Sequence, residues 1–143
     1  MPIDASQSMR QAYAEELTSQ GHKRDDFVIL EADVLGGTFI KLFAEEFPER
    51  HKTFGVAEQN MISAAAGFST TGIIPVANTF GCFASLRSIE QFRNSVCLPN
   101  FNVKVVASHQ GIDVGPDGPT HQDISDIGVI RAIPNASMIS PGD

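Results

Sequence analysis

The chain has 143 residues, of which 42% are apolar, and carries a formal net charge of −7. Its length suits a single domain with its own core, and its apolar content is well above that of a disordered chain. The acidic balance and the scatter of its ten Lys and Arg residues argue against binding to nucleic acid or to an anionic membrane, since both require clustered basic residues.

Residues 1–17 are polar and lack the apolar segment of a secretory signal, and no apolar run is long enough to span a membrane. The two cysteines, Cys82 and Cys97, are too far apart for a Cys-x-x-Cys pair and have no metal-ligand residues beside them. We therefore expect two reduced core thiols in a soluble, cytoplasmic protein.

The first predicted element is a helix with one apolar face, which Ser6 or Ser8 caps and Gly21 ends. After it, strand-like and helical segments alternate. In chain order, they are a strand over 26–32, a helix over 38–47, a strand over 52–56, a helix over 58–72, a strand over 73–80, a helix over 83–96, a strand over 102–109, a helix over 124–133 and a strand over 136–140.

This alternation, without a hairpin signal between adjacent strands, predicts an α/β fold in which a parallel sheet carries helices on both faces. Ligands of such sheets lie beyond the carboxyl ends of the strands. Three stretches follow strands in this way: 33–37, 57–59 and the loop that begins at His109. The topology predicts that they meet at one edge, but it does not predict their chemistry. Because no helix follows the last strand, we expect the domain to lack its last α/β unit.

The loop over 108–123 contains two of the four histidines in the chain. One interpretation is a divalent metal site formed by His109, Asp117 and His121, since imidazole and carboxylate groups suit several divalent ions. These residues lack the His-x-x-x-His spacing that places two ligands on one helical face, which makes a metal the weaker interpretation. The alternative is a solvated, turn-rich loop, and composition alone does not decide between the two.

Phe80, Phe83 and Leu86 follow one another at intervals of three residues where a strand passes into a helix. By spacing alone, the favoured interpretation is a stripe of core residues. The functional alternative is an aromatic shelf for a flat ring, because aromatic faces stack favourably. Arg87 is expected on the opposite side of this helix, where it is either solvated or part of a salt bridge.

Glu58 is placed at the junction of a strand and an alanine-rich helix. A carboxylate in the first helical turn interacts favourably with the helix dipole, and many such residues have no other role. A catalytic carboxylate is the alternative. The physical chemistry of the sequence leaves both interpretations open.

Four stretches resemble the pyrimidine-binding domain of transketolase, in the same order and from about Arg10 to the end of the chain. They are "GVAEQNMISAAAGFSTTG", "ANTFGCF", "ASHQGIDVGPDGPTHQD" and "RAIPNASMISPGD". The resemblance implies that 1–143 is one pyrimidine-binding domain, without its last α/β unit and the domain that follows it. It corresponds to the C-terminal subunit of a split transketolase.

The resemblance implies thiamine diphosphate as cofactor, and a reaction that transfers a two-carbon ketol unit between sugar phosphates. Glu58 would be catalytic, by hydrogen bonding to a pyrimidine ring nitrogen from a dry and rigid position. Phe80 and Phe83 would stack around the ring, with Leu86 where some relatives have another aromatic residue. Asp33 would line the cofactor site.

His109 and His121 match histidines of the family that contact the sugar and its carbonyl region, so both are expected to be catalytic and to bind substrate. Asp117 matches the acid that reads the configuration of the donor's C2 hydroxyl. Arg10 matches an arginine that binds the terminal phosphate of the acceptor. A serine that the family usually has near Gly37 is missing from this chain.

The Gly-Asp-Gly…Asn motif that holds the diphosphate and its Mg²⁺ in this family does not occur in the sequence. The resemblance therefore implies an N-terminal, diphosphate-binding partner subunit that holds the Mg²⁺, in a homodimer or a heterotetramer, and an isolated chain that is inactive. Two alternatives remain: an enzyme like 1-deoxyxylulose-5-phosphate synthase, and a non-catalytic partner or truncated fragment. The synthase typically has Arg-Ala-Gly where this chain has His109-Gln110-Gly111, which favours transketolase.

Overall fold

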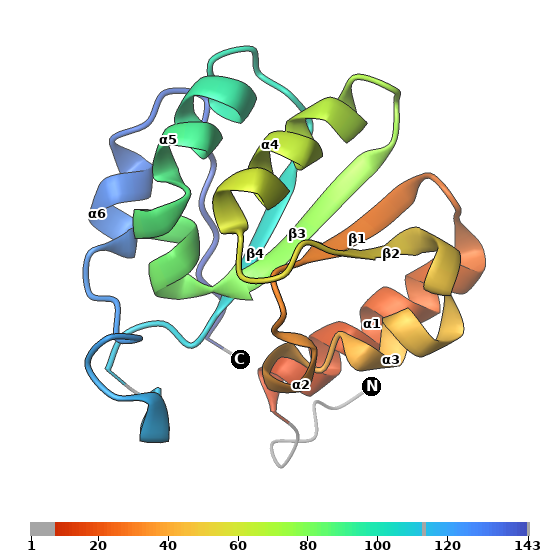
Figure 1. Cartoon of the computed structure of the whole chain (residues 1–143), viewed down its shortest axis with the longest axis horizontal. Coiled ribbons are helices and arrows are strands. Elements are labelled where there is room, and N and C mark those ends of the chain that lie inside the picture. Colours follow the sequence, from red (N-terminus) through yellow and green to blue (C-terminus); the bar gives the residue numbers. More distant parts are fainter. Residues whose placement is uncertain (1–7, 113, 143) are drawn as a thin grey trace.

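The computed structural model describes residues 8–112 and 114–142. Its centre is a four-stranded sheet in the order β2-β1-β3-β4, in which every neighbouring pair is parallel (Figure 1). The strands are β1 (Phe27–Glu31), β2 (His51–Thr53), β3 (Ile74–Phe80) and β4 (Lys104–Ser108). The predicted parallel α/β fold is confirmed.

Helices cover both faces of this sheet. One face carries α1 (Met9–Lys23) and α3 (Lys41–Glu46), and the other carries α4 (Glu58–Ser69) and α5 (Ile89–Gln91) (Figure 1). Two π-helical segments flank α5, and short helices occupy the loops. These elements are η2 (Phe83–Arg87), η3 (Phe92–Cys97), α2 (Leu35–Thr38), η1 (Pro48–Arg50), η4 (Gly115–Asp117) and α6 (Asp126–Arg131). No described helix has the length and apolar character needed to cross a membrane.

The central strand β1 is buried along its whole length and contributes to two core clusters. Val28 and Leu30 pack with the buried face of α4, while Phe27 and Ile29 pack on the opposite side with Phe43 of α3. Side chains alternate between the two faces of a strand, so a run of apolar residues is what a strand covered on both sides requires.

Gly21 does not end the first helix, as was predicted, but lies buried inside it. A Cβ atom at this position would lie 2.5 Å from the ring of Phe47, so glycine allows α1 and the segment after α3 to approach closely. The helix begins as expected, because the Ser8 side chain accepts a hydrogen bond from the Gln11 amide at 3.2 Å. The alternative cap, Ser6, lies outside the described residues.

Three further elements differ from the prediction. The helix expected over 38–47 is two helices, α2 and α3, separated at Phe39, whose φ of 61° is left-handed. The helix expected over 83–96 is interrupted by the π-helical segments η2 and η3. The strand expected over 136–140 is not formed: Ile139 is 88% exposed, and no strand of the described chain pairs with this segment.

Candidate functional site

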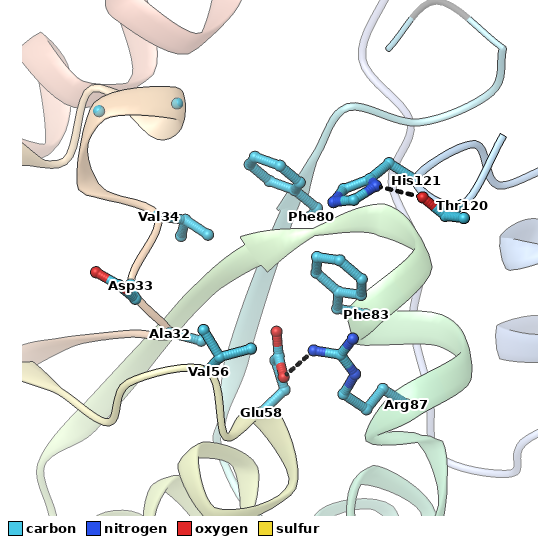
Figure 2. Close-up of a pocket in the computed structure, with 12 residues that line it drawn as sticks. Ala32, Asp33, Val34, Val56, Glu58, Phe80, Phe83, Arg87, Thr120 and His121 are labelled. Atoms are coloured by element: carbon cyan, nitrogen blue, oxygen red, sulfur yellow. Dashed lines mark hydrogen bonds and ion pairs between the residues drawn. The ribbon is translucent and has the colours of Figure 1, made fainter. Parts of the chain in front are cut away.

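A cavity of about 480 Å³ lies at the carboxyl ends of the strands (Figure 2). Its wall combines residues that follow β1, β2, β3 and β4, which are Ala32, Asp33, Val34, Gly36, Gly37, Val56, Glu58, Phe80, Phe83, Arg87, Thr120 and His121. The structure therefore brings together all three stretches that were expected to meet at this edge of the sheet.

Glu58 is the first residue of α4, and its side chain is only 1% exposed although it lines the cavity. Behind it, Met61, Ile62 and Ala65 are fully buried and fix α4 against the sheet. A carboxylate that served the helix dipole alone would have no need of burial, because that interaction is available at an exposed position. Burial in a cavity wall thus favours a functional role for Glu58.

Arg87 was expected on the opposite side of its helix, solvated or in a salt bridge, but it lies in the site. Its Nη1 donates to Glu58 Oε2 at 2.8 Å, and its guanidinium lies 4.1 Å from the centre of the Phe83 ring. The expected salt bridge is confirmed, but the expected side was wrong. Residues four apart share a helical face, so Phe83 and Arg87 point to the same side. The i, i+4 spacing was the signal that could have found it.

Phe80 and Phe83 form an aromatic pair on the cavity wall. Their rings are nearly parallel, with centres 5.9 Å apart and an interplanar angle of 11°. The His121 ring meets Phe83 edge-on at 5.2 Å, and the His109 ring lies 4.1 Å from Phe80. Both phenylalanines are only partly buried, so they face the cavity as a shelf and are not core residues. Leu86 is 53% exposed and does not line the cavity.

The loop after β1 forms the opposite wall. Asp33 lines the cavity with a left-handed backbone conformation, φ 61°. A Cβ atom at Gly37 would lie 3.1 Å from the Phe80 ring, tighter than ordinary van der Waals contact. A side chain at this position would therefore crowd the Phe80 ring unless the ring moved.

His109 lies beside the aromatic pair, and Arg10 contacts its ring. Arg10 Nη1 donates to Gly37 O at 2.5 Å and lies 3.0 Å from His109 Nε2. A guanidinium can only donate, so Nε2 is the acceptor and the ring proton is on Nδ1, which donates to Ser108 Oγ at 2.8 Å. Burial, followed by the positive charge of Arg10, lowers the pKa of His109 below its ordinary value.

Replacing Arg10 by Met should raise the pKa of His109, because the change removes a nearby positive charge and leaves the imidazolium less disfavoured. The measurement is an NMR pH titration of the histidine ring signals, with His109→Gln used to assign the peak. Arg24→Met is the matched control, since Arg24 pairs with Asp26 and has no contact with the site. An unchanged or lowered pKa of His109 would contradict this electrostatic role.

The remaining residues of the long loop have separate positions. Asp117 is exposed in η4 and does not line the cavity, although its negative charge opposes the lowering of the His109 pKa. His121 lines the cavity, and its Nδ1 lies 2.9 Å from Thr120 Oγ1. Within residues 8–112 and 114–142, no group of three or more His, Cys, Asp or Glu side chains is arranged to hold a metal ion.

Comparison with known proteins gives the site a family context. The family model described as "Transketolase, pyrimidine binding domain" matches residues 5–143. The chain is 52% identical over 135 residues to a protein of Methanocaldococcus jannaschii that is provisionally named a transketolase C-terminal section, covering 94% of this chain and 43% of that protein. It is 37% identical over 135 residues to the 6-deoxy-6-sulfo-D-fructose transketolase subunit SqwH of Clostridium sp., covering 94% and 42%.

In both cases, the chain spans less than half the length of the relative. A similarity of 36% over 136 residues also links it to the 1-deoxy-D-xylulose-5-phosphate synthase of Syntrophus aciditrophicus, covering 95% of this chain and 21% of that enzyme.

Solved structures agree with the sequence comparisons. A split-gene transketolase, described as an inactive beta4 tetramer, superposes with a TM-score of 0.74 at 42% identity, over 87% of this chain and 39% of that one. The transketolase of Pichia stipitis, in complex with sedoheptulose 7-phosphate, gives a TM-score of 0.82 at 26% identity, over 94% and 21%. Sequence and structure thus agree, and the chain belongs to the family of transketolase pyrimidine-binding domains.

Proposed function

We propose that this chain is the pyrimidine-binding half of a thiamine diphosphate-dependent transketolase. Together with a partner subunit, it transfers a two-carbon ketol unit from a ketose phosphate donor to an aldose phosphate acceptor. The observation that carries the proposal is the buried Glu58 carboxylate at the edge of an aromatic shelf, inside a cavity of about 480 Å³. A flat aminopyrimidine needs both parts: a face to stack on and an acid that can hold a proton at a ring nitrogen.

The residues of the cavity suit this cofactor. Phe83, with Phe80 beside it, offers an aromatic face, and Glu58 reaches the same space from α4. When bound, thiamine diphosphate supplies the nucleophilic carbon that carries the two-carbon unit. The role of Glu58 is to hold a proton at the ring nitrogen, from a helix end that packing keeps rigid.

Our proposal places the sugar beside two histidines. His121 lines the cavity next to Phe83, and His109 presents an imidazole fixed by Arg10 and Ser108. We assign to both the binding of sugar oxygens near the reacting carbonyl. Arg10 hydrogen bonds to Gly37 and His109, so we propose that its main role is to orient His109. Binding of the acceptor's phosphate is a second proposed role of Arg10. We propose that Asp117, which is exposed beside this region, recognises the configuration of the donor's C2 hydroxyl. We propose that Leu86 and Asp33 flank the cofactor site.

A partner subunit is part of the proposal. The 143 residues contain no Gly-Asp-Gly…Asn motif, and we propose that a partner chain holds the diphosphate and its Mg²⁺, in a homodimer of whole units or a heterotetramer. The similar split-gene transketolase is described as inactive in its beta4 form. We infer that this chain also requires its other half for turnover.

The test is an assay of the full-length protein with its diphosphate-binding partner, thiamine diphosphate and Mg²⁺. A ketose phosphate and an aldose phosphate are supplied, and mass spectrometry should detect an acceptor lengthened by two carbons. The chain without the partner should give no product. A second reaction with pyruvate and an aldehyde phosphate tests the synthase alternative, which the similarity to 1-deoxy-D-xylulose-5-phosphate synthases raises. The proposal would be overturned if only the mixture of pyruvate and aldehyde phosphate gave product, or if neither mixture did.

A further inference from the structure

Arg87 occupies the space between the two groups proposed to recognise the cofactor ring. Its guanidinium lies over the face of Phe83 at 4.1 Å from the ring centre, and its Nη1 donates to Glu58 Oε2 at 2.8 Å (Figure 2). We name the space between the Phe83 ring and the Glu58 carboxylate the ring subsite. Within residues 8–112 and 114–142, Arg87 is the only residue that donates a hydrogen bond to the Glu58 carboxylate. Both residues line the cavity.

A guanidinium and a protonated aminopyrimidine share the features that this subsite recognises. Both are planar, both carry delocalised charge, and both present N–H groups in their plane. Arg87 makes the two contacts that the ring needs: stacking on an aromatic face and donation to a buried carboxylate. Because the Arg87 guanidinium covers this face of Phe83 at 4.1 Å, a ring can stack on the same face only if the guanidinium moves away.

We propose that Arg87 is a specificity-determining residue that fills the ring subsite in the free chain and is displaced by the cofactor ring. The inference rests on the proposed function. A ligand that replaces Arg87 must bring its own donor to Glu58, because an unpaired buried charge is strongly unfavourable. A flat ring with an N–H also replaces the contact of Arg87 with the face of Phe83. The Arg87 side chain is 41% exposed, so its guanidinium has solvent into which it can move.

The position of Arg87 in the chain suits a side chain that moves. It is the last residue of the π-helical segment η2, next to Ser88, where the helix changes its hydrogen-bond pattern. The buried residues of η2 are Ala84 and Ser85, so the packing of the segment does not depend on the Arg87 head group. Arg93, on η3, provides a natural comparison because it is exposed and donates to its neighbour Asn94.

The test is calorimetric titration of thiamine diphosphate into the complex of this chain with its diphosphate-binding partner. Arg87→Gln should bind thiamine diphosphate about fivefold more tightly than the unaltered protein, because the ligand no longer has to break an ion pair and a cation–π contact of modest strength. Arg87→Lys should give a smaller gain, because an ammonium group still pairs with Glu58 but stacks less well. Arg93→Gln should bind as the unaltered protein does.

Inorganic diphosphate is the ligand control, because it fills only the partner's half of the site and its affinity should not respond to Arg87→Gln. Thermal unfolding of each variant establishes that it is folded, and Arg87→Lys retains the charge if the glutamine variant is unstable. Unchanged or weaker binding of thiamine diphosphate by folded Arg87 variants would overturn this inference alone. Failure of the unaltered complex to bind thiamine diphosphate would overturn the proposed function and the inference with it.

Discussion

Replacing Glu58 by Gln should lower ketol transfer by the assembled enzyme about a thousandfold, within the range of a lost general acid–base group. Glutamine keeps the shape of the side chain but cannot exchange a proton with a ring nitrogen. The change should lower kcat and not cofactor binding, because the cofactor ring can still stack on Phe83 and the partner can still bind the diphosphate. The measurement is steady-state transfer with a coupled assay, over a range of cofactor concentrations.

The matched control for Glu58 is Glu90→Gln. Glu90 is an exposed acid on α5, paired with its neighbours Gln91 and Asn94, so its removal should leave transfer unchanged. Analytical ultracentrifugation should show that Glu58→Gln and Glu58→Ala assemble with the partner as the unaltered chain does. Full activity in Glu58→Ala would exclude Glu58 from the chemistry and, with it, the proposed mechanism.

The edge at which the site lies was predictable from the sequence because it depends only on topology. Alternating strands and helices imply parallel strands, and parallel strands end on the same side. The residues that follow β1, β2 and β4 were therefore expected to meet, and Asp33, Glu58 and His121 all line one cavity. Hydrophobic periodicity was enough for this step, since it reports which faces are buried.

What sequence reasoning missed depends on contacts between distant residues. Phe39 adopts a left-handed conformation and lies under the Arg10 guanidinium at 5.6 Å, a contact across 29 positions that no local pattern reports. Gly21 was read as a helix end because glycine is frequent there, whereas its real constraint is the ring of Phe47. Tertiary packing overrides local propensity in both cases.

Arg87 illustrates a different kind of failure. An arginine on an amphipathic helix is usually solvated or salt-bridged on the side away from the core, and this general expectation outweighed the i, i+4 relation to Phe83. The deciding fact is that the Glu58 carboxylate is only 1% exposed and pairs with Arg87. The burial of Glu58 was itself not readable from its place in the first helical turn, so the pair could only be recognised in three dimensions.

Replacing Asp123 by Ala should destabilise the fold by about 2–4 kcal/mol, because several buried donors lose their acceptor at once. Asp123 is 2% exposed, and its carboxylate accepts from the Ser85 hydroxyl on η2 and from the Ser125 amide and hydroxyl, both at 2.9 Å. The Asp126 amide donates at 3.2 Å to Asp123 Oδ1, which also accepts both bonds from Ser125. The measurement is the free energy of unfolding from urea titration.

Asp117→Ala is the matched control, because Asp117 is an exposed aspartate of the same loop and its removal should change stability by less than about 0.5 kcal/mol. Ser85→Ala combined with Asp123→Ala should cost less than the sum of the two single changes, since both remove the same hydrogen bond. Additive effects of the two changes would contradict a direct link between the loop and η2.

The stability that Asp123 contributes should also depend on pH. Burial acts to raise the pKa of its carboxyl, but the hydrogen bonds from Ser85, Ser125 and Asp126 outweigh burial and lower it. A carboxyl whose pKa is lower in the folded state stabilises the fold above its unfolded pKa, near 4, and loses that contribution as the pH falls below it. The difference in stability between the unaltered chain and Asp123→Ala should therefore be constant from pH 5 to 7 and shrink below about pH 4.

Asp123 also matters for the site, because it connects the loop that carries His121 with the segment η2. Its backbone pairs with Gly111 through hydrogen bonds of 2.8 and 3.0 Å, which close the loop that carries His121. Its side chain fastens that loop to η2, the segment that carries Phe83 and Arg87. Loss of the carboxylate should therefore loosen His121 relative to Phe83, and the ring signals of His121 should shift in Asp123→Ala but not in Asp117→Ala. Unperturbed His121 signals in a destabilised Asp123→Ala protein would confine the role of Asp123 to folding.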